Sequence, residues 1–147
     1  MIQRVQSIFL LVVVISSVCL FIFPFVAYEN MYNVFTLHAV KQPYCGFWYY
    51  SAEALNLLIF ILSFICIFLF KKRILQFKIA NVIALLSVLL LGVLLFLEVV
   101  NIEKFLGGDK RILWPSYLPI VSMIFAYLAG RFIKKDENLV RSADRIR

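Results

Sequence analysis

The residues that could do chemistry in this chain are few and scattered along it. His38 is the only histidine, so a metal site or haem pair built on several histidines cannot form within one chain. Glu53 and Glu98 flank apolar stretches, and two neighbouring carboxylates could share a proton or bind a cation. No serine-hydrolase, zinc-protease, P-loop or dinucleotide-binding motif is present in the sequence. We therefore predict no catalytic, metal-binding or cofactor-binding residues, and an enzyme using Glu53, Glu98 or His38 is the third alternative.

Four long stretches without a charged side chain surround these residues. They contain 24, 17, 19 and 19 residues, and as helices they would reach about 26 to 36 Å, against a hydrocarbon core of roughly 30 Å. The pattern predicts one all-α membrane domain over residues 1–147, an up-down bundle of four transmembrane helices. The predicted spans cover residues 8–28, 52–70, 79–99 and 113–131, followed by a tail over residues 132–147.

The composition supports this class of protein. Hydrophobic residues make up 64% of the chain and charged residues only 16%, so a water-soluble chain of this length could not bury its apolar surface. The first stretch is longer than the apolar region of a cleaved signal peptide, and we expect it to remain as a helix. Pro24 near its outer end predicts a kink or an early end of that helix.

The distribution of basic residues predicts the orientation. If both termini are cytoplasmic, the cytoplasmic segments hold 11 Lys and Arg residues and the outer segments hold 4. Basic residues that flank membrane helices are retained on the cytoplasmic side. The net charge of +7 is therefore expected to contact anionic lipid headgroups at that face, and no nucleic acid is expected as a partner.

The first outer segment, residues 29–51, is the longest loop. Residues 33–40 are typical of a strand, and Gln42-Pro43 is typical of a turn, so a short hairpin with residues 44–50 is one prediction for this loop. An interfacial helix would use similar residues and is the alternative. Cys45 is the only cysteine outside the spans, so it is either a small buried hydrophobe or a thiol for a partner chain.

Aromatic residues gather on the predicted outer face. An interfacial belt explains them, but belts usually occur at both interfaces, whereas only Tyr127 lies nearer the cytoplasm. The excess also fits a contact surface for another protein, because aromatic residues are enriched at interface centres. The candidate contact residues are Trp48, Tyr49 and Tyr50.

The tail after the fourth span is predicted to be a short amphipathic helix. Phe132, Leu139, Ala143 and Ile146 would share one face, interrupted by Asp136. That face could lie on the membrane or dock on a partner, and a solvated charged tail is the alternative. The candidate contact residues here are Leu139, Arg141, Arg145 and Ile146.

Polar side chains inside the spans are expected to be satisfied by hydrogen bonds within their own helix or to a neighbouring helix. Hydrogen bonds within a helix or between helices are the ordinary role of such residues in a membrane. No charged residue lies in the middle of a span, which argues against a transport site of the usual kind. The polar candidates are Ser16, Ser17, Asn56, Ser63, Asn81, Ser87 and Ser122.

The ends of the chain also resemble a known family. The residues that carry the likeness are the opening Met1-Ile2-Gln3-Arg4-Val5-Gln6, the Leu75-Gln76 pair after the basic turn, and the closing Lys134-Lys135-Asp136-Glu137, Leu139-Val140-Arg141-Ser142 and Asp144-Arg145. They resemble the domain of unknown function 4293 family, small four-helix inner-membrane proteins of Bacteroidota. The resemblance implies a Gram-negative cytoplasmic membrane and carries no catalytic or ligand residues.

The functional hypothesis is a non-enzymatic accessory or scaffold subunit of a larger inner-membrane complex, with envelope protein handling as one candidate role. Its expected partners are the lipid bilayer and other membrane proteins. The alternative is a small oligomeric carrier or channel for a hydrophobic or ionic solute. A single chain of this size would need copies of itself to line such a path.

Overall fold

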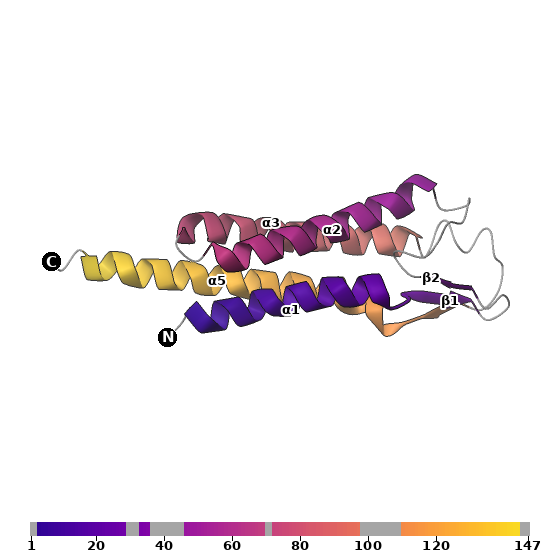
Figure 1. Ribbon diagram of the computed structural model, residues 1–147, viewed down its shortest axis with the longest axis horizontal. Helices are drawn as coiled ribbons and strands as arrows, with labels where there is room; N and C mark the ends of the chain where they lie inside the picture. Colours follow the sequence, from indigo (N-terminus) through magenta and orange to yellow (C-terminus); the bar gives the residue numbers. More distant parts are fainter. Residues whose placement is uncertain (1–2, 29–32, 36–45, 70–71, 98–109, 145–147) are drawn as a thin grey trace.

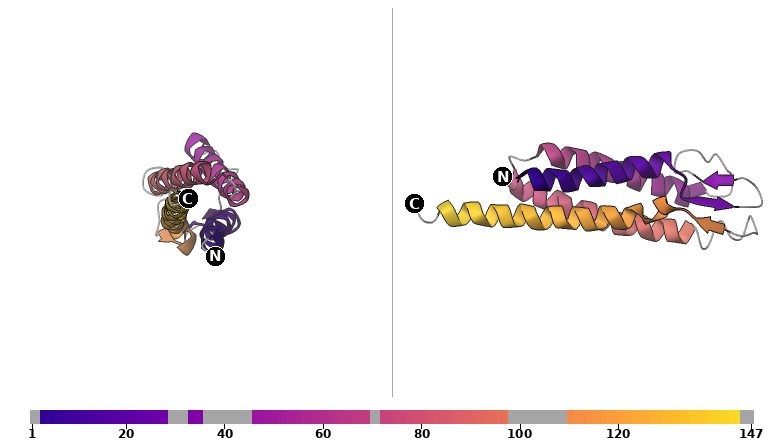
Figure 2. Two further views of the ribbon diagram at one scale, coloured as in Figure 1. Left: turned by 90° about the vertical axis from the view of Figure 1, so that its left-hand side faces the viewer. Right: turned by 90° about the horizontal axis from the view of Figure 1, so that it is seen from below.

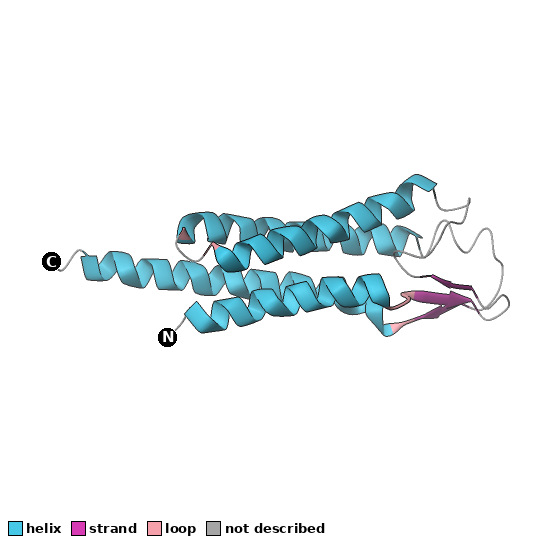
Figure 3. Cartoon of the chain, in the orientation of Figure 1, coloured by secondary structure: helices cyan, strands magenta, loops and turns pink. Residues whose placement is uncertain are grey.

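In the part of the chain that the structure describes, four long helices pack together and a small sheet lies at one end of them (Figures 1 and 3). The structure is a computed structural model that describes residues 3–28, 33–35, 46–69, 72–97 and 110–144. Each of the four helices is long and apolar enough to cross a membrane. The helices are α1 (Gln3–Ile22), α2 (Gly46–Phe68), α3 (Arg73–Phe96) and α5 (Leu118–Asp144).

The helices run alternately in opposite directions and pack as a ring. Helix α1 contacts α2 and α5, and α3 contacts the same two helices from the other side (Figure 2). The start of α1, the turn between α2 and α3, and the end of α5 therefore lie at one end of the bundle (Figure 1). We call this end the basic end, after Lys72, Arg73, Lys78, Arg131, Lys134 and Lys135. The opposite end is called the sheet end.

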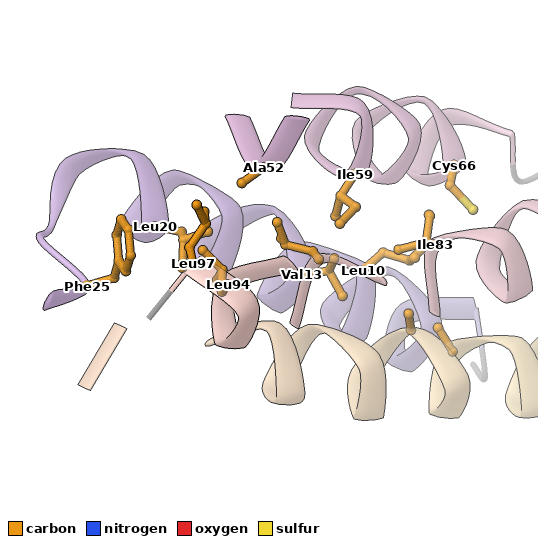
Figure 4. Packing of buried hydrophobic residues seen from close by; sticks show 13 residues of the cluster. Leu10, Val13, Leu20, Phe25, Ala52, Ile59, Cys66, Ile83, Leu94 and Leu97 are labelled. Atoms are coloured by element: carbon orange, nitrogen blue, oxygen red, sulfur yellow. The ribbon is translucent and has the colours of Figure 1, made fainter. Parts of the chain in front are cut away.

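The core runs along the axis of this ring, with side chains from all four helices (Figure 4). Leu10, Ile59, Ile83 and Ala126 are examples from α1, α2, α3 and α5 in turn, and each is almost fully buried. Many large apolar side chains point outward instead, as expected where lipid is the solvent. The predicted bundle of four membrane-length helices is therefore confirmed.

Helix α1 is shorter than the first predicted span, because Pro24 ends it. The backbone N–H of Phe23 still donates to the Cys19 carbonyl at 2.8 Å, but proline has no N–H to continue the ladder. The early end expected from Pro24 is confirmed, while the prediction of helix up to Tyr28 is wrong. Val26–Tyr28 is a strand, β1.

Three short strands form the sheet, in the order β2-β1-β3. Strand β2 (Asn33–Phe35) pairs antiparallel with β1, so that Val26 lies opposite Phe35. Strand β3 (Lys110–Ile112) pairs with the other edge of β1, and Val26 also lies opposite Ile112. The start of the predicted strand is confirmed, but its proposed partner is wrong. Residues 46–50 of that partner segment begin α2 itself, and the interfacial-helix alternative for the rest of the loop falls on residues 36–45, outside the described ones.

Helix α5 follows a short 3-10 helix, η2 (Trp114–Tyr117), which has Pro115 in its first turn. It then continues without a break to Asp144, so the tail is not a separate short helix as predicted. No proline interrupts the sequence after Pro119, and Gly130 is held in helical conformation by its packing against α3. The bundle helix and the tail are consequently one rigid element.

Candidate functional site

The basic end of the bundle is where polar, charged and apolar side chains meet around surface grooves. Two interactions connect the start of α3 to the second half of α5. Arg73 Nη1 lies 3.1 Å from Asp136 Oδ2 in a partly buried ion pair. The Lys134 ammonium lies 5.8 Å from the centroid of the Phe77 ring, a cation–π contact. These contacts fix α5 against the first turns of α3, at the end of the bundle.

A third contact stabilises the turn between α2 and α3. Gln76 Nε2 donates to the Cys66 carbonyl at 3.1 Å, and the Cys66 thiol donates to the Gln76 carbonyl at 3.6 Å. Both side chains are buried. The Cys66 carbonyl, in the last turn of α2, also accepts from the Leu69 N–H at 3.3 Å, so Gln76 adds a second donor at the end of this helix. Cys66 is thus a structural residue in a protected position.

The grooves at the basic end differ in charge. One groove of about 620 Å³ has described lining residues from α5, and another of about 640 Å³ lies between α3 and α5. None of the described residues that line the first is acidic, whereas Glu137 lines the second. The lining of the first groove is Arg131, Phe132, Lys134, Lys135, Asn138 and Leu139.

The end of α5 extends beyond the bundle. Asp136 is level with Arg73, the first residue of α3, and the helix continues from there to Asp144 (Figure 1). Eight further residues of helix, 137–144, add about 12 Å at ~1.5 Å per residue. Leu139 and Val140 on this projection are 49% and 41% exposed. Leu139 lines the groove on α5 and Val140 lines the groove between α3 and α5, so the two exposed apolar side chains lie on neighbouring sides of this helix.

The predicted tail contacts are only partly within the described side chains. Leu139 is exposed as the docking hypothesis requires, and the side chain of Arg141 is outside the described part. Arg145 and Ile146 lie outside the described residues altogether. Phe132, which was grouped with the apolar face of the tail, instead packs on Phe9 of α1 with the ring centroids 5.5 Å apart.

Aromatic residues do gather at the sheet end. Tyr50, Trp114 and Tyr117 are more than half exposed there, at 66%, 55% and 58%. Trp48 and Tyr49 lie in the first turns of α2, but their side chains are outside the described part. Of the three candidate contact residues on this face, the structure therefore describes only the side chain of Tyr50.

Four of the seven polar residues predicted inside the spans donate hydrogen bonds to backbone carbonyls within or between helices, as predicted. Ser16, Ser63 and Ser87 donate to carbonyls of their own helices at 2.8 to 2.9 Å. Asn56 Nδ2 on α2 donates to the Ser17 carbonyl on α1 at 3.1 Å. The Ser17 hydroxyl is a buried exception, because it has no hydrogen-bond partner. The gap that it lines is too narrow for a water molecule.

Of the residues that the enzyme alternative would use, the structure describes only Glu53, a half-buried residue of α2. His38 and Glu98 lie outside the described residues, as does Cys45 of the first outer loop. Within the described ranges, no three His, Cys, Asp or Glu side chains gather as metal ligands would.

Sequence reasoning missed the contacts between α3 and α5. Arg73 and Asp136 are far apart in the chain, and nothing in the sequence pairs one basic residue of a turn with one acidic residue of a tail. Gln76 was noted only as part of the family likeness. A glutamine at the start of an otherwise apolar helix was the one available signal, because such a group needs a partner when buried.

Comparison with known proteins decides the family. A family model described as Domain of unknown function (DUF4293) matches residues 2–146, nearly the whole chain. The chain belongs to this family. No curated protein and no solved structure matches the chain. The resemblance seen at the two ends and the basic turn is therefore confirmed as membership, and the family's description assigns no activity.

Proposed function

We propose that the protein is a non-enzymatic accessory or scaffold subunit of a larger inner-membrane assembly. The observation that carries this proposal is the projecting end of α5, with Leu139 and Val140 exposed on it. A helix that leaves the bundle as a rigid extension can present an apolar pair to a groove on a partner. Assembly with envelope protein machinery is the proposed setting.

The fixed position of the projecting end of α5 favours a docking role for it over that of a solvated tail. The Arg73–Asp136 ion pair and the contact of Lys134 with Phe77 hold the base of the projection. A partner therefore does not have to order this helix on binding, and the entropic cost of association is lower. Exposed apolar side chains beside charged ones at the end of the bundle favour a binding surface.

The docking role can be tested by adding charge to the projection. Replacing Leu139 and Val140 by aspartate should remove at least about 2 kcal/mol of binding, roughly thirtyfold in affinity, if the pair is the centre of the contact. The measurement is quantitative recovery of stoichiometric partners after purification in mild detergent. The bundle should keep its thermal stability, because both residues lie on the projection.

The matched control is Asn138→Asp with Ser142→Asp. This variant adds the same charge to the same helical turns at exposed positions but keeps the apolar pair. Partner recovery that falls equally in both variants would mean that charge, rather than the apolar pair, is recognised. A self-oligomer that conducts a solute, with no second chain, would instead support the carrier or channel alternative.

The proposed orientation places both termini in the cytoplasm. It follows from the division of the basic residues and from the basic end, where α1 begins and α5 ends. In a variant without native cysteines, an impermeant thiol reagent on intact spheroplasts should label Cys at position 50 and not Cys at position 142. Tyr50 and Ser142 are both exposed and lie at opposite ends. The reverse labelling pattern would show the opposite orientation.

A further inference from the structure

Charge is divided around the second half of α5. Arg131, Lys134 and Lys135 are all exposed and line the same groove, and none of the described residues that line it is acidic. Asp136 and Glu137 are half-buried on the side of the bundle, and Asp136 is paired with Arg73. Three cations consequently gather on the outward face, with Glu137 bordering only a smaller neighbouring groove that Lys134 also lines.

The same outward face continues toward the middle of the bundle as an apolar stripe. Tyr127 precedes Arg131 by one helical turn, and Ile124 precedes it by two. Their side chains are 57% and 45% exposed. Along this face the order is therefore aliphatic at Ile124, aromatic at Tyr127 and cationic from Arg131 onward. Positions 124 and 131 are about 10 Å apart along the helix.

We propose that this outward face of α5 binds one anionic phospholipid, with the headgroup phosphate in the groove of Arg131, Lys134 and Lys135 and the acyl chains along Tyr127 and Ile124. Arginine and lysine donate charge-assisted hydrogen bonds to phosphate oxygens, and the Asn138 amide adds a neutral donor. The order of groups along the face matches the order of groups in a phospholipid. A soluble acidic peptide would satisfy the cations but not the apolar stripe.

Two details favour a defined site over diffuse attraction to a charged surface. Lys134 is held by its contact with the Phe77 ring, so one of the three cations is fixed in place. A second groove at the same end contains Lys72 and Lys78, but Glu137 lines it as well. Glu137 also lines a third, smaller groove of about 180 Å³, so the groove on α5 is the one of these three whose described lining has no acidic residue.

The test compares two double variants that remove equal charge. The first is Arg131→Gln with Lys135→Gln, and the second is Lys72→Gln with Lys78→Gln. Native mass spectrometry of the detergent-purified protein would measure binding of phosphatidylglycerol, with phosphatidylcholine as the neutral reference. The wild-type protein should retain one phosphatidylglycerol in preference to phosphatidylcholine. The first variant should bind it roughly thirtyfold more weakly, and the second should lose less than about threefold.

Three further results decide the proposal. Equal weakening by the two variants would overturn it, because the attraction would then be a property of total charge. Displacement of phosphatidylglycerol by millimolar inorganic phosphate would also overturn it, since the site would then be one for a soluble anion. Asn138→Arg adds a cation to the groove and should tighten phosphatidylglycerol binding severalfold, a gain that a misfolded variant cannot produce. No tightening in a variant of unchanged thermal stability would contradict the proposal.

Discussion

Replacing Phe25 by alanine is expected to lower the free energy of unfolding by about 3 kcal/mol. The Phe25 side chain is completely buried at the sheet end, where it lies near Leu20, Leu94 and Leu97 (Figure 4). Removing the ring would leave a cavity under the sheet, and the surrounding side chains would lose their contacts with it. Unfolding in mixed micelles titrated with a denaturing detergent would measure the change.

The backbone of Phe25 makes this test specific for the ring. Its carbonyl oxygen accepts from the Leu113 N–H at 3.0 Å and from Ser116 Oγ at 2.7 Å, and both bonds survive the substitution. Phe23→Ala is the matched control, because the Phe23 side chain is 42% exposed and its ring centroid lies 5.2 Å from that of Trp114. We expect this variant to lower the free energy of unfolding by roughly 1 kcal/mol or less. Equal losses in the two variants would show that the sheet end is not packed around Phe25.

Gly130→Leu is expected to lower stability by roughly 1 to 3 kcal/mol, because the added side chain has no room. A Cβ at position 130 would lie 3.1 Å from Asn81 Oδ1 and 3.6 Å from the Ala80 Cβ. Helices α3 and α5 would have to separate, and the ion pair between Arg73 and Asp136 would be strained. The same detergent titration would measure the stability of the folded bundle.

Gly92→Leu is the matched control for that variant. Gly92 lies in α3, and a Cβ there would meet nothing within 4 Å. Both substitutions remove a helical glycine, which gains up to about 1 kcal/mol of helix propensity in each case. The difference between the two variants therefore isolates packing. Gly130→Ala should be nearly neutral, since the amide end of Asn81 can shift by a few tenths of an ångström. A Gly130→Leu variant as stable as Gly92→Leu would contradict the close contact of α3 and α5.

The membrane-length helices could be predicted because their cause is local. Absence of charge over 17 to 24 residues is a property of the chain itself, and lipid tolerates almost only helices in such stretches. The end of α1 was predictable for the same reason, since the missing N–H of Pro24 acts on its own helix. The predicted bonds of Ser16, Ser63 and Ser87 also close within one turn.

The sheet and the contacts at the basic end could not be predicted in this way, because they depend on residues that are far apart in the chain. Strand β1 is a strand only because β2 and β3 supply partners on its two edges, and three residues carry too weak a pattern to reveal this. The amphipathic face assigned to the tail was wrong at Phe132, whose position on α5 directs it against Phe9. A helical wheel gives the angle of a side chain but does not identify the neighbouring helix.

The sequence by itself determined that the chain is a membrane protein of four spans, which family it resembles, and where its basic residues lie. Only the tertiary structure decided which of those basic residues are neutralised and which remain open. Arg73 is neutralised because the packing of α3 against α5 brings Asp136 within 3.1 Å of it. Arg131, Lys134 and Lys135 stay together on the outward face because the half-buried acidic residues lie on the other sides of the same helix. Coulombic pairing depends on distances of a few ångströms, and those distances exist only once the helices have packed.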